Sequence, residues 1–307
     1  MELVLEGPSE ETFKKIQDQL GEVTERFEHN VKLLEEWMAC QPHLPKNYDK
    51  RILPIFLRGS KHDMEKTKKK LESYFTVKAA IPALFSRRDP ERKDILETIE
   101  YSDFVVMPKL TPEGYRVTIS NLKTNDLSKF KIDILMARGA LSACLRTAME
   151  TPISGDVLIY DASNISAAHA AIFLTPTVRK CIIDGPEAYP NRLRQIHVIN
   201  AHPIIDKVVS IIKTLIKEKI RQRFYVHSKP EMLLNYIPSE CLPNEYGGSG
   251  GKLENLSKMT HNFAVKNAGW LKEQESAKLI GPLPDKYRYD EDYGTGTEGS
   301  FRKLAID

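Results

Sequence analysis

Four basic side chains in one stretch of the chain, residues 189–223, are the best candidates for chemistry. Arg192 and Arg194 lie in the segment YPNRLR, and Lys219 and Arg223 lie in the segment KEKIRQR. From residue 179 to residue 223 the chain carries ten lysines and arginines against four acidic residues, an excess of six positive charges. Arginine forks onto phosphate oxygens and lysine adds a point charge, so this patch is expected to attract the phosphates of lipids or nucleic acids.

A strand and a helix are expected to position these cations. Residues 196–200 (IHVIN) alternate as a strand does, and residues 204 to about 221 have the spacing of one long helix. The apolar stripe of this helix is wider than a core helix needs. Two interpretations remain open: a buried helix whose C-terminal lysines favour the helix dipole, or a lid over an apolar cavity that also touches an anionic surface. The apolar positions are Ile204, Ile205, Val208, Val209, Ile211, Ile212, Leu215 and Ile216.

The sequence offers no catalytic constellation beside this patch. The glycine-rich segment 247–251 lacks the GxxxxGK[ST] pattern of a phosphate loop, and GxSxG, HExxH and GxGxxG do not occur. The histidines and the four cysteines lack metal-ligand spacing, so we expect neither a metal nor a cofactor. Asp161 ends an apolar strand but has no acid/base partner, and we expect it to cap the next turn. His197 and His227 lie in strand candidates and are expected to be hydrogen-bonded structural residues.

Composition narrows the class of protein. A chain of 307 residues with 41% apolar residues suits one large domain or two unequal ones. The net charge of +3 is weaker than the basic footprint of a typical nucleic-acid binder. The acidic N-terminus shows no signal-peptide core, and no run of about 18 apolar residues is long enough to span a membrane. Together with widely separated cysteines, these features predict a cytoplasmic protein.

The periodicity divides the chain into an all-helical unit and an α/β region. Helices are expected after Ser9 and within 23–38, 52–57 and 64–75, with Gly59 ending the third as a left-handed residue and Asp63 capping the fourth. Beyond about residue 90, strands and helices alternate, which predicts a mostly parallel or mixed sheet. The strand candidates are 104–108, 115–119, 157–161, 196–200 and 224–227, and the helix candidates are 132–149, 165–173, 176–183, 204–221 and 253–271.

Several of these segments resemble signature blocks of the CRAL-TRIO family. LRGSKHDMEKT (57–67) is similar to a block of the N-terminal helical domain. YPNRLRQIHVINAHPIID (189–206), IKEKIRQRFYVH (216–227) and LPNEYGGSGG (242–251) resemble three successive blocks of the lipid-binding domain. The ending EGSFRKLAID (298–307) resembles insect-type members of the alpha-tocopherol-transfer and retinaldehyde-binding branch. The resemblance covers nearly the whole chain.

The resemblance implies both a fold and a function. It implies a helical domain at 1–90, a CRAL-TRIO α/β domain at 91–255 with a mixed sheet floor and a helical lid over an apolar cavity, and a C-terminal helix and tail at 256–307. It implies a non-enzymatic cytosolic carrier for a small hydrophobic ligand, such as a retinoid, a tocopherol or a similar isoprenoid. The expected partners are that ligand and, transiently, a phosphoinositide-containing membrane surface. Nucleic acid is not expected, and the oligomeric state is open.

Site residues follow from the same resemblance. Arg192, Arg194, Lys219 and Arg223 match a cleft that holds phosphoinositide headgroups, and the lid corresponds to residues 202–219. The residues expected to form the ligand pocket and lid are Ile165, Phe173, Ile183, Ile196, Ile204, Ile205, Val208, Val209, Ile212, Leu215 and Ile216.

Two departures and two alternatives accompany this prediction. Thr214 stands where many members have a proline, which predicts a lid helix without a kink. Arg138 and Ser142 fall near polar pocket positions, and Arg138 either points to solvent or pairs with a polar group of the ligand. One alternative function is phosphatidylinositol or phospholipid exchange, or lipid sensing, on the same fold. A lipid-modifying enzyme is the other, and it needs an acid/base pair in the cavity.

Overall fold

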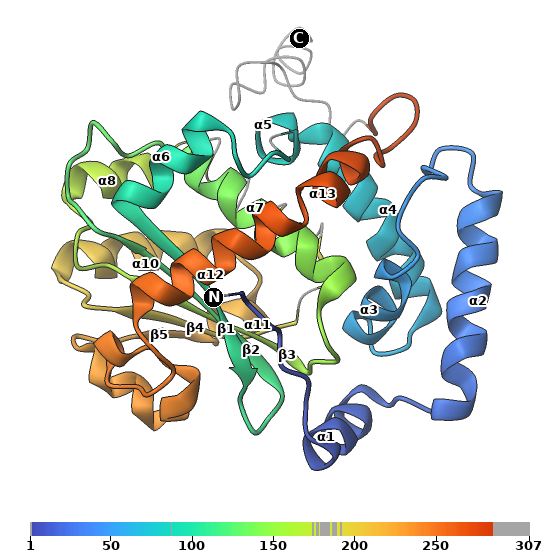
Figure 1. Ribbon diagram of the computed structural model, residues 1–307, viewed down its shortest axis with the longest axis horizontal. Helices are drawn as coiled ribbons and strands as arrows, with labels where there is room; N and C mark the ends of the chain where they lie inside the picture. Colours follow the sequence, from blue (N-terminus) through green and yellow to red (C-terminus); the bar gives the residue numbers. More distant parts are fainter. Residues whose placement is uncertain are drawn as a thin grey trace, which may run out of the picture.

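The computed structural model describes residues 2–86, 88–173, 189–190 and 192–284, together with Thr175, Val178 and Gly185. It shows a group of N-terminal helices beside a five-stranded mixed sheet that is covered by further helices (Figure 1). The predicted fold class is therefore confirmed. Ile183 and the tail 287–307 lie outside the described residues, as does most of the predicted helix 176–183. The predicted domain boundaries stay a prediction.

The N-terminal helices between residues 24 and 85 share an apolar core with Ala148, Tyr189 and Ala277. The bounds of the N-terminal helices are α1 Glu10–Leu20, α2 Thr24–Cys40, α3 Ile52–Gly59, α4 Met64–Ala80 and α5 Pro82–Phe85. The predicted caps are confirmed: Ser9 Oγ accepts from the Thr12 amide at 3.2 Å, and Asp63 Oδ1 accepts from the Lys66 amide at 3.0 Å. Each bond satisfies an amide that lacks a partner within its helix.

The sheet has the strand order β1-β2-β3-β4-β5. The strands are β1 Ser102–Leu110, β2 Tyr115–Leu122, β3 Gly155–Asp161, β4 Leu193–Ile199 and β5 Phe224–Val226. β1 and β2 form an antiparallel hairpin, and the other neighbouring pairs are parallel. The helices of this region are α6 Lys93–Tyr101, α7 Ile132–Met149, α8 Ala167–Phe173, α10 Pro203–Leu215, α11 Glu218–Arg221, α12 Leu253–Lys266 and α13 Ala268–Glu275, with 3₁₀ turns at Pro230–Asn235, Ser239–Cys241 and Asn244–Tyr246.

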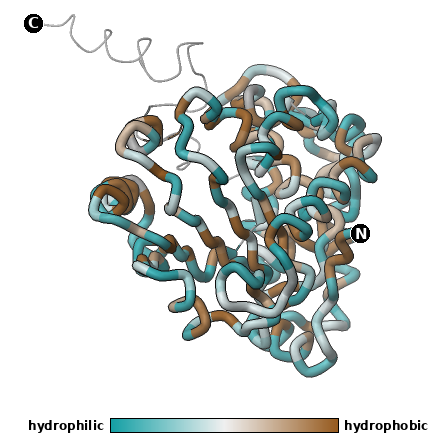
Figure 2. The backbone as a smooth tube through the Cα atoms, turned by 60° about the vertical axis from the view of Figure 1, so that its left-hand side comes forward, coloured by the Kyte–Doolittle hydropathy of each residue, from teal (hydrophilic) through white to brown (hydrophobic). Residues whose placement is uncertain are grey.

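The two faces of the sheet are covered differently. On one face, Val117 and Ile159 are buried under the 3₁₀ turns and the start of α12. The other face, which we call the lid face, packs through Val198 against α10 and through Leu122 against the cluster that includes α8. Figure 2 shows apolar stretches, in brown, along the strands and in the helices that cover them. α12 also protects the β1 edge, because hydroxyls of Ser257 and Thr260 accept from β1 amides that face outward.

A buried ion network fixes the segment that leads into β3. Arg116, which is fully buried, contacts Glu150 at 2.9 Å, and Arg146 contacts both Glu150 and Asp156 at 2.6 Å. Arg116 also donates to the carbonyl of Glu6 at 2.9 Å, which holds the N-terminal segment against the hairpin. Every charge in this network has an opposite charge beside it, as burial requires.

The role predicted for Gly59 is wrong. It is the last residue of α3 and not a left-handed residue, whereas the two left-handed residues are Lys61 and His62, with φ of 57° and 58°. A β-carbon on Gly59 would lie 2.8 Å from Pro190 Cβ and closer still to the Pro190 carbonyl oxygen. Glycine is needed here because the end of α3 packs directly against the backbone that leads into β4.

Replacing Gly59 with alanine should therefore destabilise the protein, by about 1–3 kcal/mol, because the added methyl group forces the two segments apart. Gly269→Ala is the matched control: it lies in α13 with no atom within 4 Å of the added carbon, so helix propensity should make it neutral or stabilising. Urea unfolding of both variants measures the difference. Equal stability of the two variants would contradict the proposed packing role.

A pair of buried histidines joins β4 to β5. His197 Nδ1 lies 2.8 Å from His227 Nε2, and His197 Nε2 lies 3.1 Å from Gln195 Oε1. Because the Gln195 oxygen only accepts, His197 carries its proton on Nε2 and accepts from His227 at Nδ1. Burial, and then the neighbouring His227, lower the pKa of His197 to about 4. The predicted structural role of both histidines is confirmed.

Acid should weaken the fold through His197. Its pKa in the folded protein lies below the unfolded value of about 6.5, so between these pH values only the unfolded chain binds the proton. Stability is therefore lost as pH falls from 6.5 towards 4, by up to about 3 kcal/mol from this residue. Urea unfolding across this pH range checks the slope, and His197→Phe, which cannot titrate, should show a shallower one. An identical slope would exclude His197 as its source.

Candidate functional site

The four predicted headgroup cations gather at one edge of the sheet. β4 and β5 are parallel neighbours, so Arg192 and Arg194 at the start of β4 lie beside Arg223, which precedes β5. Arg223 donates to the carbonyl of Leu193, which joins the two segments directly. Lys219 comes from α11, immediately before Arg223. The structure thus brings together the residues that the sequence places about 30 positions apart, and their role stays a prediction.

These cations repel one another and lack acidic partners. Burial, and then the charges of Arg194 and Arg223, lower the pKa of Arg192 to about 10. Burial, and then Arg194, also lower the pKa of Arg223. Within the described ranges none of the four, Lys219 included, has a carboxylate oxygen within 4 Å, and Arg192 Nη1 is buried without a hydrogen-bond partner. An anion bound here would relieve both the repulsion and the unmet donors.

Contacts with the backbone of Ser154 and Gly155 hold Arg194 in place. Arg194 donates Nε and Nη2 to the carbonyl of Ser154, at 3.1 and 3.0 Å, and its guanidinium lies 5.4 Å from the centre of the Tyr115 ring. A β-carbon on Gly155 would lie 2.5 Å from both the Arg192 carbonyl oxygen and Arg194 Cγ. Gly155 therefore permits the close approach that sets where Arg194 lies.

Sequence reasoning missed a fifth cation, Lys61, in the turn between α3 and α4. Its side chain is exposed, and the charge of Arg192, followed by burial and the charges of Arg194 and Lys219, lowers its pKa. The only signal for it was its place in the block LRGSKHDMEKT, since no rule of spacing predicts two consecutive left-handed residues that are not glycine. We call Lys61, Arg192, Arg194, Lys219 and Arg223 the basic cluster.

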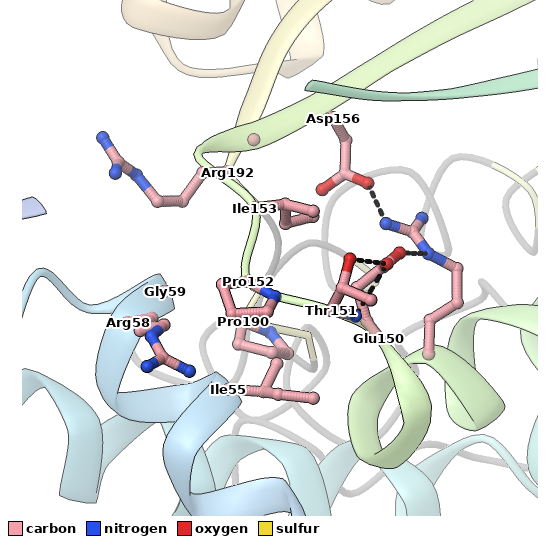
Figure 3. A pocket seen from close by; sticks show the side chains of 12 residues that line it. Ile55, Arg58, Gly59, Glu150, Thr151, Pro152, Ile153, Asp156, Pro190 and Arg192 are labelled. Atoms are coloured by element: carbon pink, nitrogen blue, oxygen red, sulfur yellow. Dashed lines mark hydrogen bonds and ion pairs between the residues drawn. The ribbon is translucent and has the colours of Figure 1, made fainter. Parts of the chain in front are cut away.

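A hollow of about 40 Å³ lies behind the cluster, between α3 and the segment before β3. Figure 3 shows Arg192 pointing away from the ion-paired group around Asp156 and Glu150. Arg58, on the other wall, forks onto Glu22 at 2.8 and 3.0 Å. Burial would raise the pKa of Glu22, but hydrogen bonds from His62 and Arg58 lower it to about 2. Of the described arginines that line this hollow, Arg58 and Arg146 each contact a carboxylate, whereas Arg192 has none within 4 Å.

The predicted lid helix is α10, and its two sides differ. Ile205 and Val209 are buried against Val198 on the lid face, and Val208 is buried as well. Ile204 and Ile211 are exposed, at 36% and 41%. Among the other predicted pocket and lid residues, Ile196 is buried, Ile165, Phe173, Ile212 and Ile216 are half-buried, and the side chain of Leu215 lies outside the described residues.

The prediction of one unbroken helix over residues 204–221 is wrong. α10 ends at Leu215, Ile216 and Lys217 have extended backbone, and α11 begins at Glu218. A proline is not needed for this break: Thr214 Oγ1 donates back to the Ile211 carbonyl at 2.7 Å, and such bonds compete with the helix ladder. Thr214 itself lies within α10, before the break, and its effect on the bending of the lid stays a prediction.

Asp161 anchors the other end of the lid. Its Oδ1 accepts from the Ser163 amide and from Asn200 Nδ2, each at 2.9 Å, and its Oδ2 accepts from the Tyr246 hydroxyl at 2.9 Å. Asn200, whose φ is 53°, turns the chain from β4 towards α10. The predicted capping role of Asp161 is confirmed, and its oxygens are occupied by these donors.

The sequence predicts an apolar cavity beneath the lid, and Tyr160 marks accessible space on that face of the sheet. Tyr160 lies on the central strand β3. Burial raises the pKa of its hydroxyl group, yet 46% of the residue's surface is exposed. Tyr160 is therefore not closely packed on this side, and an enclosed cavity beneath the lid stays a prediction. Arg138 does not point to solvent, since it is 5% exposed, so that alternative is wrong.

The described residues contain neither a candidate metal site nor a helix that could span a membrane. No group of three His, Cys, Asp or Glu side chains in the described ranges is placed to hold a metal ion. No helix in the same part of the chain is long and apolar enough to cross a membrane.

Two family models match the chain. One, described as "CRAL/TRIO domain", matches residues 100–248, and one described as "Pinta-like, UBA domain" matches residues 23–95. Together they cover α2 to α5, the sheet, the lid and the whole basic cluster.

Curated relatives and a solved structure agree with these matches. The chain is 28% identical over 253 residues to the alpha-tocopherol transfer protein-like protein of Mus musculus. The aligned region covers 81% of this chain and 73% of that protein. It is 25% identical over 247 residues to clavesin-1 of Xenopus laevis, covering 79% and 74%. The predicted insect-type assignment stays a prediction. The crystal structure of Sfh5 has the same fold, with a TM-score of 0.50 and 14% identity over 82% of this chain and 92% of that one. The domain match, the relatives and the shared fold show that this chain belongs to the CRAL-TRIO family.

Proposed function

We propose that this protein is a non-enzymatic cytoplasmic carrier that encloses a small hydrophobic ligand beneath α10 and releases it at phosphoinositide-containing membranes. Membership in a family of lipid-binding and transfer proteins supports the carrier role. A relative named for alpha-tocopherol transfer supports a ligand of isoprenoid size. The observation that carries the proposal is a basic cluster without acidic partners at the C-terminal end of the lid helix.

The chemistry of the basic cluster suits a headgroup with several phosphates. Three arginines offer forked donors, and Lys61 and Lys219 add point charges from two other elements. A multiply charged anion would replace mutual repulsion with attraction at every one of these side chains. Lys61 would extend the site to the N-terminal helices, so that headgroup binding involves both matched parts of the chain.

The exposed residues of α10 suit contact with the membrane itself. Ile204 and Ile211 lie on the same face of the helix, two turns apart at i and i+7. Both expose at least 36% of their surface. A short apolar stripe beside a cationic patch binds the boundary between lipid headgroups and acyl chains. Once α10 dips into that boundary, the lid face would open towards lipid and not towards water, which favours ligand release.

Non-enzymatic action is supported by the state of the candidate acid/base residues. Asp161 is held by Ser163, Asn200 and Tyr246, and His197 is neutral and bonded on both nitrogens. His197 has no free nitrogen lone pair, and the Asp161 carboxylate already accepts three structural hydrogen bonds, so neither is placed as a general base for a bound lipid.

Charge reversal at the basic cluster tests membrane release. Arg192→Glu and Lys219→Glu should lower the rate of transfer to vesicles containing phosphatidylinositol bisphosphate by about tenfold or more, since each reverses a charge that contacts phosphate. Uptake of a fluorescent tocopherol or retinoid analogue should stay unchanged. Transfer is measured by the loss of that fluorescence to quencher-containing vesicles.

Lys258→Glu is the matched control, because it makes the same charge change on α12, at the opposite edge of the sheet. It should transfer ligand at the native rate. If all three variants transfer equally well, the basic cluster is not the membrane site. If the two cluster variants fail to capture ligand at all, the separation between capture and release is wrong.

The nature of the carried lipid separates this proposal from phospholipid exchange. Purified native protein is extracted with organic solvent, and the extract is examined by mass spectrometry. We expect an isoprenoid-sized molecule without a phosphate, because the headgroup cluster lies outside the lid face. Phosphatidylinositol or another phospholipid in equimolar amount would favour the exchange function instead.

A further inference from the structure

A second, smaller hollow lies at the β1 edge of the sheet, the opposite edge from β5, where α7 meets β1 and α12. It measures about 10 Å³. Arg138 and Ser142 of α7 line it, together with Phe104 of β1 and His261 of α12. Its remaining lining is Ile95, Leu141, Thr260 and Ala264. The hollow therefore combines an apolar wall with a guanidinium and a hydroxyl.

Arg138 is a buried cation that forms no ion pair with the described residues, although the charge of Asp103 attracts it from beyond contact distance. It is 5% exposed, and Nη1 donates to Thr98 Oγ1, Ser102 O and Ser102 Oγ at 3.1–3.4 Å, while Nη2 donates to Ser257 Oγ at 3.4 Å. All these acceptors are neutral, and the bonds are long for a guanidinium. Among the residues described, no carboxylate oxygen lies within 4 Å of Arg138, and Asp103 nearby pairs with Lys123 at 3.1 Å. Burial lowers the pKa of Arg138 to about 10.

This pattern differs from that of Arg116 and Arg146, whereas Arg88, which is also buried, likewise donates to Phe85 O and Cys144 Sγ without a carboxylate partner among the described residues. Arg116 and Arg146 each contact Glu150, and Arg146 also contacts Asp156. A buried charge without an opposite charge is costly, and proteins normally pair it. Ser142, one turn after Arg138, makes no hydrogen bond through its hydroxyl that the described residues show, and it lines the same hollow. Arg138 and Ser142 thus both line a space whose lining residues include no acid.

The hollow lies within reach of the lid face. Phe104, which lines it, is in register with Ser120, and Ser120 is in register with Tyr160. Neighbouring strands are about 4.8 Å apart, so Phe104 lies roughly 10 Å from Tyr160 and its open space. Leu135, one turn before Arg138, packs in the cluster that contains Phe173 of α8. Phe104 thus lines the hollow and also lies on the same face of the sheet as Tyr160.

Resting on the carrier function proposed above, we propose that Arg138 and Ser142 bind the acidic end of the carried lipid, and that this end is a carboxylate. Its apolar chain would run past Phe104, over Tyr160 and beneath α10. A carboxylate accepts paired bonds from a guanidinium and would supply the missing opposite charge. The hollow is about the size of one water molecule, which suits one carboxylate oxygen but not a phosphate group with three terminal oxygens.

Matched ligand pairs test this on the native protein. Palmitic acid is compared with hexadecanol, and retinoic acid with retinol, by displacement of a fluorescent fatty-acid analogue. We expect the acid of at least one pair to bind about tenfold or more tightly than its alcohol, as a charge-assisted bond in a buried site predicts. If the alcohols bind as tightly as the acids, the carrier function stands and the role of Arg138 is overturned. If no member of either pair binds, the carrier function is overturned together with it.

Variants of Arg138 separate recognition from folding. Arg138→Met should lose the preference for acids while binding the alcohols as before, and Arg138→Lys, which keeps the charge, should retain part of the preference. Ser142→Ala should lower acid affinity about threefold, which is the loss of one hydrogen bond. Arg26→Met, an exposed arginine on α2, is the control and should change neither affinity.

Thermal unfolding of each variant shows whether it folds. If Arg138→Met does not fold, Arg138→Lys and Ser142→Ala still decide the matter, because a purely structural role would change acid and alcohol affinity alike. An unchanged acid-to-alcohol ratio in both of these variants would overturn the proposal.

Discussion

The parallel pairing of β4 with β5 is the constraint on which the rest of the site depends. Two parallel strands cannot be joined by a tight turn, so the chain must return from the end of β4 to the start of β5 by a long crossover. That crossover is the segment 200–223, which contains α10 and α11. It places a helix over the lid face, and it returns Arg223 to the edge where Arg192 and Arg194 already lie. One topological requirement therefore produces both a lid and a cationic edge.

Charge balance distinguishes this edge from the ion pairs around Arg58, Arg116 and Arg146. Arg58, Arg116 and Arg146 each have a carboxylate partner at short distance, and these pairs hold the helices and the hairpin together. The basic cluster has no such partners among the described residues, although Arg192 is half-buried and its pKa is lowered by its neighbours. If this edge had only a structural role, we would expect acidic residues beside these cations, or fewer cations. The surplus is explained if an external anion completes the site.

Local rules predicted the elements well and their tertiary relations poorly. Ser9 and Asp63 were recognisable as caps because capping depends on residues a few positions apart, and α7 has the predicted bounds because its apolar spacing is regular. Gly59 was misread because its cause, contact with Pro190, is 131 positions away in the chain and leaves no local pattern. The break after Leu215 was missed because Ile216 and Lys217 continue the helical spacing of α10, and tertiary packing overrides such a pattern. Resemblance supplied the members of the basic cluster, whereas only the fold could show that Lys61 joins them.

The break between α10 and α11 gives the lid two ends of different character. At the first end, Asn200 is bound to Asp161, which is itself bound to Tyr246, so the turn out of β4 is fixed to the sheet. At the second end, α11 carries Lys219 into the basic cluster, and two extended residues separate it from α10. An anion bound by the cluster would hold α11 in place without fixing α10, because extended residues transmit rotation poorly. Under the proposed function, the crossover 200–223 thus combines headgroup binding with lid movement. The basic cluster and Asp161 keep its two ends attached. The helix α10 between them is free to exchange its contacts with Val198 for contacts with lipid.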